Sequence, residues 1–131
     1  MQYKLIIPGT LPNLNDYLKA ERVTIRHQGS FTTKGNIMKQ EWQGYIIHYI
    51  RQQLKGLHIE KQIDLHYLFV EPNRKRDKDN ISGFAHKVIQ DSLVESGTID
   101  NDGWKNIGDT YDKCDVDAKN PRIEVVIVEV E

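Results

Sequence analysis

The sequence lacks any long hydrophobic run, and among its 131 residues it has one cysteine and a net charge of only −1. No apolar segment approaches the roughly 20 residues that a membrane-spanning helix needs, so we expect no membrane insertion. Cys114 alone can form neither an internal disulfide nor a thiolate cluster for zinc, which predicts a reducing, cytoplasmic compartment. The small net charge excludes binding of nucleic acid over the whole surface, so any such binding depends on local patches.

Several familiar catalytic and metal-binding motifs are also missing. There is no Gly-rich phosphate loop, no Gly-x-Ser-x-Gly and no His-Glu-x-x-His. The acidic segments that begin at Asp77 and Asp100 do not fit a calcium-binding EF-hand loop, because Ile81 and Trp104 stand at their fifth positions. The first residues lack a long apolar segment and a small-residue cleavage site, so we expect them to belong to the mature protein.

The length and composition are those of one small soluble domain. A chain of 131 residues suffices for one compact core, so we expect a single domain over residues 1–131. Hydrophobic residues make up 38% of the chain and charged residues 28%, both ordinary for a soluble protein. One core predicts one principal functional site.

The hydrophobic periodicity predicts six elements in the order β-α-β-α-β-β. Pro8-Gly9 ends the first strand, and the chain is then expected to be mostly irregular to about residue 32. Thr32 and Thr33 are both candidate caps for the helix that follows. The order predicts an α+β domain, a mixed or antiparallel sheet with two main helices on it. The predicted strands cover 3–7, 57–70, 104–111 and 123–130, and the predicted helices cover 34–54 and from 79 or 80 to 95. The second helix is expected to face the core with an apolar stripe of Ile81, Phe84, Ala85, Val88, Ile89 and Leu93.

The most informative segment places two carboxylates within a basic run, between a strand and a helix. It reads Arg74-Lys75-Arg76-Asp77-Lys78-Asp79-Asn80. If the link is extended, Asp77 and Asp79 point to the same side and could share one divalent cation. A phosphate and a carboxylate repel each other unless a metal ion bridges them, so the pattern favours a metal site that receives a polyanion.

A plainer interpretation exists for each of these residues. Asp79 could be a helix cap, worth about 1 kcal/mol, and Asp77 a solvated charge that balances its neighbours. Lys87 points back toward the helix start and could reach the acidic pair, or it could pair with Asp91 on the surface. Gly83 could allow a phosphate backbone or a second chain to approach, or be an accidental weak point in the helix.

A third acid could complete the site. Asp102 lies in the turn Asp100-Asn101-Asp102-Gly103, just before a predicted strand, although Asp-Gly is also common in turns. The later acids Asp112, Asp115 and Asp117 are interpreted as a solvated acidic loop, and His86 as a structural residue.

The residues around this segment resemble those of the RusA family of Holliday junction resolvases, found in bacteria and their phages. The similar residues are Arg-Asp77-x-Asp79-Asn80-Ile81, a helix carrying Lys87 and ending in Asp91-Ser92-Leu93-Val94-x-x-Gly97, and then Asn101-Asp102. Near the start, Pro12-Asn13-x-Asn15-x-Tyr17 and Lys34-Gly35 are also similar, so the resemblance spans nearly the whole chain.

The resemblance implies a homodimer that binds four-way DNA junctions and cleaves phosphodiesters with Mg²⁺. By motif, Asp77, Asp79 and Asp102 would hold one or two Mg²⁺ ions, for which Mn²⁺ is a possible substitute, and Lys87 would offset charge on the scissile phosphate. The expected DNA-binding residues are Arg74, Lys75, Arg76, Lys78 and Asn80.

Two other functions are compatible with the same residues. A metal-dependent nuclease could act on another branched or single-stranded DNA, because dimer geometry rather than a short motif selects the substrate shape. A non-catalytic nucleic-acid-binding module would need only the basic run, with the aspartates serving as caps and turns. In that second case Mg²⁺ would be dispensable and Asp→Asn changes nearly silent.

Overall fold

A computed structural model describes all residues 1–131 as three helices and six strands in one α+β domain. The observed order is β-α-β-β-α-β-α-β-β. The elements are β1 (Gln2–Pro8), α1 (Leu14–Glu21), β2 (Thr24–His27), β3 (Ser30–Thr33), α2 (Lys34–Leu54), β4 (Ile63–Glu71), α3 (Lys78–Glu95), β5 (Ile107–Val116) and β6 (Arg122–Glu129).

The main sheet is mixed and has the strand order β1-β6-β4-β5. The pairs β1–β6 and β6–β4 are antiparallel, whereas β4 and β5 are parallel and are joined through α3. Because the two parallel strands run the same way, their carboxyl ends lie at one edge of the sheet, where α3 begins. The candidate functional site lies at this edge.

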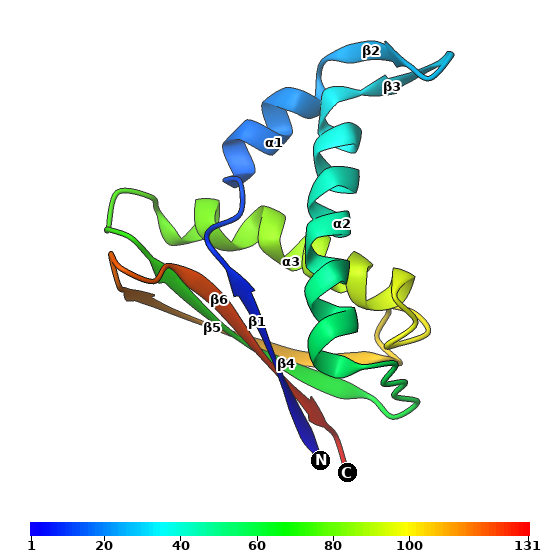
Figure 1. Cartoon of the computed structure of the whole chain (residues 1–131), viewed down its shortest axis with the longest axis vertical. Coiled ribbons are helices and arrows are strands. Elements are labelled where there is room, and N and C mark those ends of the chain that lie inside the picture. The colour runs from blue at the N-terminus through cyan, green and yellow to red at the C-terminus, as the bar shows by residue number, and fades with distance from the viewer.

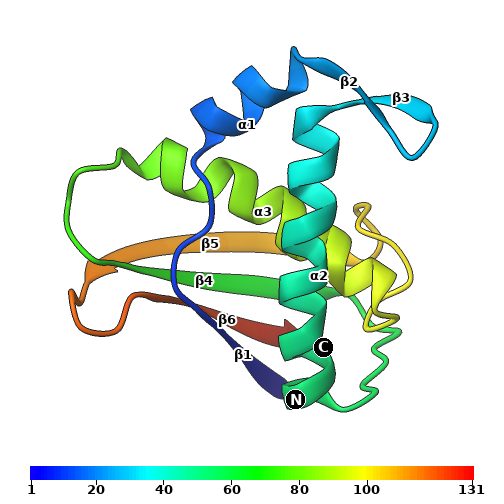
Figure 2. The ribbon, with the colours of Figure 1, turned by 45° about the horizontal axis from the view of Figure 1, so that its top comes forward.

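The helices lie on one face of the sheet, with α2 and α3 nearest to it and α1 beyond them (Figures 1 and 2). Strand residues that alternate toward the helices, such as Leu65, Tyr67 and Phe69 of β4, are buried. The predicted apolar stripe of α3 is confirmed, because all of its members are buried. These members are Ile81, Phe84, Ala85, Val88, Ile89 and Leu93. No helix is long and apolar enough to cross a membrane.

The α+β class and the helix over 34–54 are confirmed, and of the two candidate caps Thr33 is the one whose side chain accepts from the backbone N–H of Asn36. The prediction of an irregular chain to residue 32 is wrong, because that stretch forms α1 and the β2–β3 hairpin. These elements are too short for a periodic pattern to reveal them. The strand expected over 104–111 lies instead at 107–116, so the acids interpreted as a solvated loop partly belong to β5.

Glu124 links the two antiparallel strands β1 and β6 through charged hydrogen bonds. Its carboxylate accepts from Lys4 Nζ at 2.6 Å and from Arg122 Nε at 2.8 Å. These two hydrogen bonds hold the pKa of Glu124 below its ordinary value. A lowered pKa in the folded state means that this stabilisation is present above the unfolded pKa of about 4.3 and is lost as pH falls through the folded pKa.

We therefore expect Glu124→Gln to lower the free energy of unfolding at neutral pH by about 1–2 kcal/mol. The difference from the unsubstituted protein should disappear in acid, once the carboxyl group is protonated in both states. Urea unfolding of both proteins across this pH range measures it. A difference that stays constant with pH would show that the two hydrogen bonds to Glu124 do not depend on its charge.

Candidate metal and nucleic-acid site

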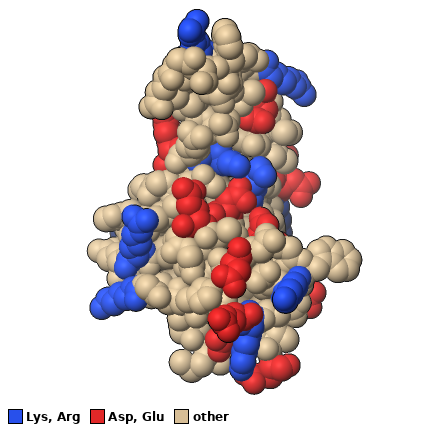
Figure 3. Space-filling model, turned by 90° about the vertical axis from the view of Figure 1, so that its right-hand side faces the viewer, with Lys and Arg blue, Asp and Glu red and all other residues tan.

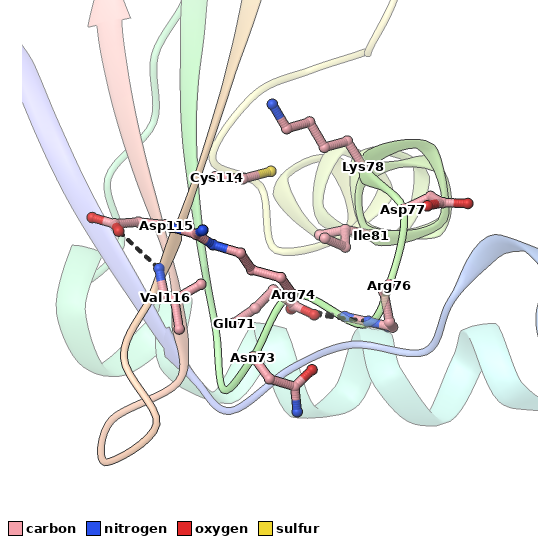
Figure 4. Close-up of a pocket in the computed structure, with 10 residues that line it drawn as sticks. All are labelled: Glu71, Asn73, Arg74, Arg76, Asp77, Lys78, Ile81, Cys114, Asp115 and Val116. Atoms are coloured by element: carbon pink, nitrogen blue, oxygen red, sulfur yellow. Dashed lines mark hydrogen bonds and ion pairs between the residues drawn. The ribbon is translucent and has the colours of Figure 1, made fainter.

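The predicted Asp77–Asp79 segment lies where the carboxyl ends of β4 and β5 meet the start of α3. In the parallel pairing, Val70 lies opposite Asp115 and Glu71 opposite Val116 at the ends of the strands. In open parallel α/β sheets, ligands bind outside the carboxyl ends of the strands beside helix N-termini, and the one parallel pair of this mixed sheet has the same local arrangement. Ten residues line a cavity of about 440 Å³ at this edge, among them Arg74, Asp77 and Lys78 (Figure 4).

Arg76 fixes the turn that leads from β4 into α3. Its Nε and Nη2 donate to the two carboxylate oxygens of Glu71, each at 2.8 Å, and its Nη1 donates to the carbonyl of Leu11 at 2.8 Å. Glu71 is only 6% exposed, so it needs this charged partner. The prediction of Arg76 as a DNA-binding residue is corrected here, because its guanidinium holds the loop together.

The remaining charged residues of the segment are exposed. Asp77 has an extended backbone and precedes the first helical residue, Lys78, but its carboxylate makes no capping hydrogen bond. Asp79 lies inside the first turn of α3, where a negative charge is stabilised by the helix dipole. Neither carboxylate forms an ion pair or accepts a hydrogen bond within the chain, so both are available to a ligand.

The helix begins one or two residues earlier than predicted, and this changes the directions of the side chains. Because Lys78 is already helical, the segment from Asp77 to Asp79 is not the extended link that the sequence analysis considered. Asp77 and Lys78 point to opposite sides of the helix start (Figure 4). Asp77 lines the cavity described above, whereas Asp79 lines a neighbouring one of about 260 Å³, and Lys78 borders both.

Two acids of β5, which the sequence pattern had indicated to be part of a solvated loop, also lie beside the start of α3. Asp115 lines the cavity with Asp77, and Asp112 lines the cavity with Asp79. Asp112 also contacts His86 of α3, with Oδ1 2.7 Å from Nε2. Residues 107–116 show no alternation of buried and exposed positions, because β5 is an edge strand and is exposed along most of its length, so the period of two that indicates a strand is missing.

Asp102 lies at the other end of α3. It is exposed in the loop between α3 and β5, and its backbone N–H donates to the side chain of Asn101 at 2.8 Å. The 18 residues of α3 span about 27 Å at 1.5 Å per residue, and this length separates Asp102 from Asp77 and Asp79. The expectation that the three aspartates converge in one chain is therefore wrong.

Lys87 also lies away from the acidic pair. It is eight residues beyond Asp79, or about 12 Å along the helix axis, and its Nζ is 4.0 Å from the carboxylate of Asp91. Lys39 of α2 approaches the same carboxylate at 3.2 Å. The plainer interpretation of Lys87, a surface lysine that pairs with Asp91, describes this structure.

Asn80 and Gly83 attach α1 to α3. The side-chain oxygen of Asn80 accepts from the backbone N–H of Asn15 at 3.3 Å, so Asn80 supports the fold in addition to its predicted DNA contact. A Cβ atom at Gly83 would lie 2.8 Å from Leu14 Cδ2. The glycine therefore admits a side chain of α1, rather than a phosphate backbone or a second chain.

The structure allows a direct test of the predicted magnesium centre. No three His, Cys, Asp or Glu side chains lie close enough together to hold a metal ion. The residues therefore do not fit a three-aspartate centre within one chain. Mg²⁺ is, however, usually held by one or two carboxylates together with waters and substrate phosphates. Asp77 and Asp79 are exposed and unpaired beside basic residues but line different cavities, so the role that fits each of them is that of a single carboxylate ligand.

Comparison with known proteins adds no further constraint. No protein-family model matches the chain, and a comparison with curated proteins finds no match. The resemblance to the RusA family therefore stays a prediction, carried by the motifs in the sequence.

Proposed function

We propose that the protein is a homodimeric, Mg²⁺-dependent endonuclease that resolves four-way DNA junctions in recombination and repair. It would act in the cytoplasm of a bacterium and be encoded by the bacterium or by a phage. The observation that carries the proposal is the presence of the exposed, unpaired carboxylates of Asp77 and Asp79 at the start of α3, beside Arg74, Lys75 and Lys78. Acidic and basic side chains are both useful at one place if a divalent cation and a phosphate bind there together.

Each group has a role that follows from its charge. Asp77 and Asp79 would hold Mg²⁺, which when bound supplies Lewis-acid polarisation of a phosphodiester oxygen. Arg74, Lys75 and Lys78 would hold phosphates on either side of the scissile bond. Such contacts make affinity fall steeply with salt and carry little base specificity.

A homodimer changes what Asp102 can do. Within one chain it is separated from the acidic pair by the length of α3, so it could join a metal site at Asp77 and Asp79 only from a second chain. A two-fold axis would then create two equivalent sites, as cleavage of two opposed strands requires. If instead the site belongs to one chain, Asp112 and Asp115 are the acids that line its cavities.

Cleavage of a panel of labelled DNAs tests the function. We expect nicking of a four-way junction with Mg²⁺ or Mn²⁺, no nicking with EDTA, and much less nicking of intact duplex. Preferential cleavage of forks, flaps or single strands would instead favour a nuclease for another DNA structure. If the protein binds all these DNAs without metal and cleaves none of them, it is a nucleic-acid-binding module and not a nuclease. The lack of three clustered acids is the observation that favours this alternative.

Mixing two inactive variants tests the shared site. If Asp102 acts from the second chain, heterodimers of Asp77→Asn and Asp102→Asn chains contain one intact site and should nick a single strand of a junction. Neither homodimer should cut at all. If Asp102→Asn homodimers cut as well as the unsubstituted protein, Asp102 has no part in the reaction. Light scattering establishes that the molecules are dimers, and native mass spectrometry with one variant isotope-labelled establishes that the chains exchange.

A further inference from the structure

The β2–β3 hairpin stands away from the main sheet, at the opposite end of α2 from β1 and β6 (Figures 1 and 2). It is a separate two-stranded sheet, with Arg26 opposite Phe31 and His27 opposite Ser30. Gln28 and Gly29 form its turn, with φ angles of 52° and 83°. Two consecutive positive φ angles are typical of the tight turns whose twist matches that of the strands.

The hairpin begins and ends in fixed contacts with the helices. The backbone N–H of Lys34 donates to the carbonyl of Val23 at 2.9 Å, and the hydroxyl of Thr33 donates to Glu21 at 2.7 Å. An isolated two-stranded hairpin is only marginally stable in water, so these contacts hold its base. Its tip has no other part of the chain to pack against.

An exposed aromatic ring lies on this hairpin. Phe31 is 74% exposed and does not belong to the hydrophobic core. The guanidinium carbon of Arg26 lies 5.6 Å from the centre of the ring, a cation–π contact between the two strands. A single exposed apolar side chain is ordinary on a protein surface, but aromatic rings and arginines are both enriched where proteins bind partners, so this pair on a projecting hairpin is a candidate contact surface.

The charge of the hairpin identifies the kind of partner. Residues 22–34 contain Arg22, Arg26 and Lys34 and no Asp or Glu, in a protein whose net charge is −1. None of the three basic side chains takes part in an ion pair. Basic side chains project at the top of the space-filling view, where the hairpin lies, and most of the acidic groups lie lower, among further basic ones (Figure 3). The surface is therefore complementary to a polyanion.

A phenylalanine among phosphate-binding groups favours an unpaired base. Its ring has no donor or acceptor with which to read base edges in a groove, but it can stack on the face of any base. In an intact duplex every base face is already covered by its neighbours. At a branch, a fork or a single strand, a base face is free.

We propose that the β2–β3 hairpin is a second DNA-contacting element, in which Phe31 stacks on an unpaired base while Arg22, Arg26 and Lys34 hold the adjoining phosphates. This rests on the proposed function and deepens it, because it makes DNA with exposed bases at the branch the preferred substrate. The hairpin and the start of α3 are different parts of the molecule (Figure 1), so each can be altered without the other.

Binding measured without Mg²⁺, by fluorescence anisotropy, separates this contact from cleavage. The probes are an intact duplex, the same duplex with one looped-out base, and a single strand. Phe31→Ala should weaken binding to the last two by about tenfold and leave the duplex nearly unchanged, because stacking on one base is lost. Phe31→Trp should preserve binding, since it keeps an aromatic face. Arg26→Gln should weaken binding to all three probes and reduce the dependence on salt.

Leu18→Ala is the matched control, because Leu18 is also an exposed apolar side chain but lies on α1. It should change binding to none of the probes. An equal affinity of Phe31→Ala and the unsubstituted protein for looped-out and single-stranded DNA would overturn the proposal. The proposal would also be overturned if Phe31→Ala were a monomer by light scattering and still bound DNA normally, because the ring would then contact a second chain and not DNA.

The two proposals fail in different ways. If the unsubstituted protein shows the expected preference for unpaired bases but cuts no DNA, the nuclease function fails and the hairpin proposal stands. If it cuts junctions and Phe31→Ala cuts and binds equally well, the hairpin proposal fails and the nuclease function stands. Circular dichroism of each variant checks that the fold is retained.

Discussion

Asp79→Asn should reduce cleavage of a four-way junction by about 100-fold or more, while binding of the same junction without metal stays within a few-fold of the unsubstituted protein. An amide has the shape of a carboxylate but lacks the charge that holds Mg²⁺. Asp79 makes no hydrogen bond or ion pair within the chain, so its replacement leaves no buried partner behind. Single-turnover cleavage and anisotropy binding measure the two quantities separately.

Asp16→Asn is a close control, because Asp16 is an exposed acid in the first turn of α1, as Asp79 is in α3. Both substitutions remove about the same interaction with a helix dipole, worth up to about 1 kcal/mol. Only Asp79→Asn should affect cleavage. If the two variants cut at the same rate as the unsubstituted protein, Asp79 is a helix-stabilising residue and does not belong to a metal site.

The second large effect concerns stability. Arg76→Met should lower the free energy of unfolding by about 3–5 kcal/mol, because it leaves the carboxylate of Glu71 uncompensated in an interior position. The substitution also removes the hydrogen bond to Leu11, which connects the loop after β1 to the start of α3. Urea denaturation followed by circular dichroism measures the change.

Two further variants test whether the lost stability comes from the ion pair between Arg76 and Glu71. Arg76→Met combined with Glu71→Leu should recover most of the lost stability, because no buried charge remains without a partner. Arg74→Ala, two residues earlier and exposed, should change stability by less than about 0.5 kcal/mol but weaken DNA binding. If Arg76→Met is as stable as Arg74→Ala, the ion pair with Glu71 does not hold the loop.

These neighbouring arginines show where sequence reasoning is limited. Arg74, Lys75 and Arg76 form one basic run in the sequence, and nothing local distinguishes them. The structure separates them because Glu71, five residues before Arg76, is buried at the end of β4. Whether an arginine meets a buried carboxylate or solvent depends on the direction in which the loop turns, which a linear pattern does not encode.

The short elements were missed for a related reason. α1 has eight residues, and β2 and β3 have four each, so none shows enough repeats of a period to be recognised. Their stability depends on neighbours, such as Asn80, which accepts a hydrogen bond from the start of α1, and Gly83, which makes room for Leu14. The exposure of the Phe31 ring could likewise not be predicted, because a phenylalanine between polar residues is more often part of a core.

The sequence by itself determined the α+β class, the long helix over 34–54, the apolar stripe of α3 and the acidic pair at its start. Each follows from local periodicity, capping or turn chemistry, which act over a few residues. Only the tertiary structure decided that Asp102 lies at the far end of α3, that Asp112 and Asp115 lie beside the pair, and that Arg76 is held by Glu71. Those outcomes depend on the parallel pairing of β4 with β5, a contact between segments more than 40 residues apart, and packing over such separations is a property of the whole folded chain.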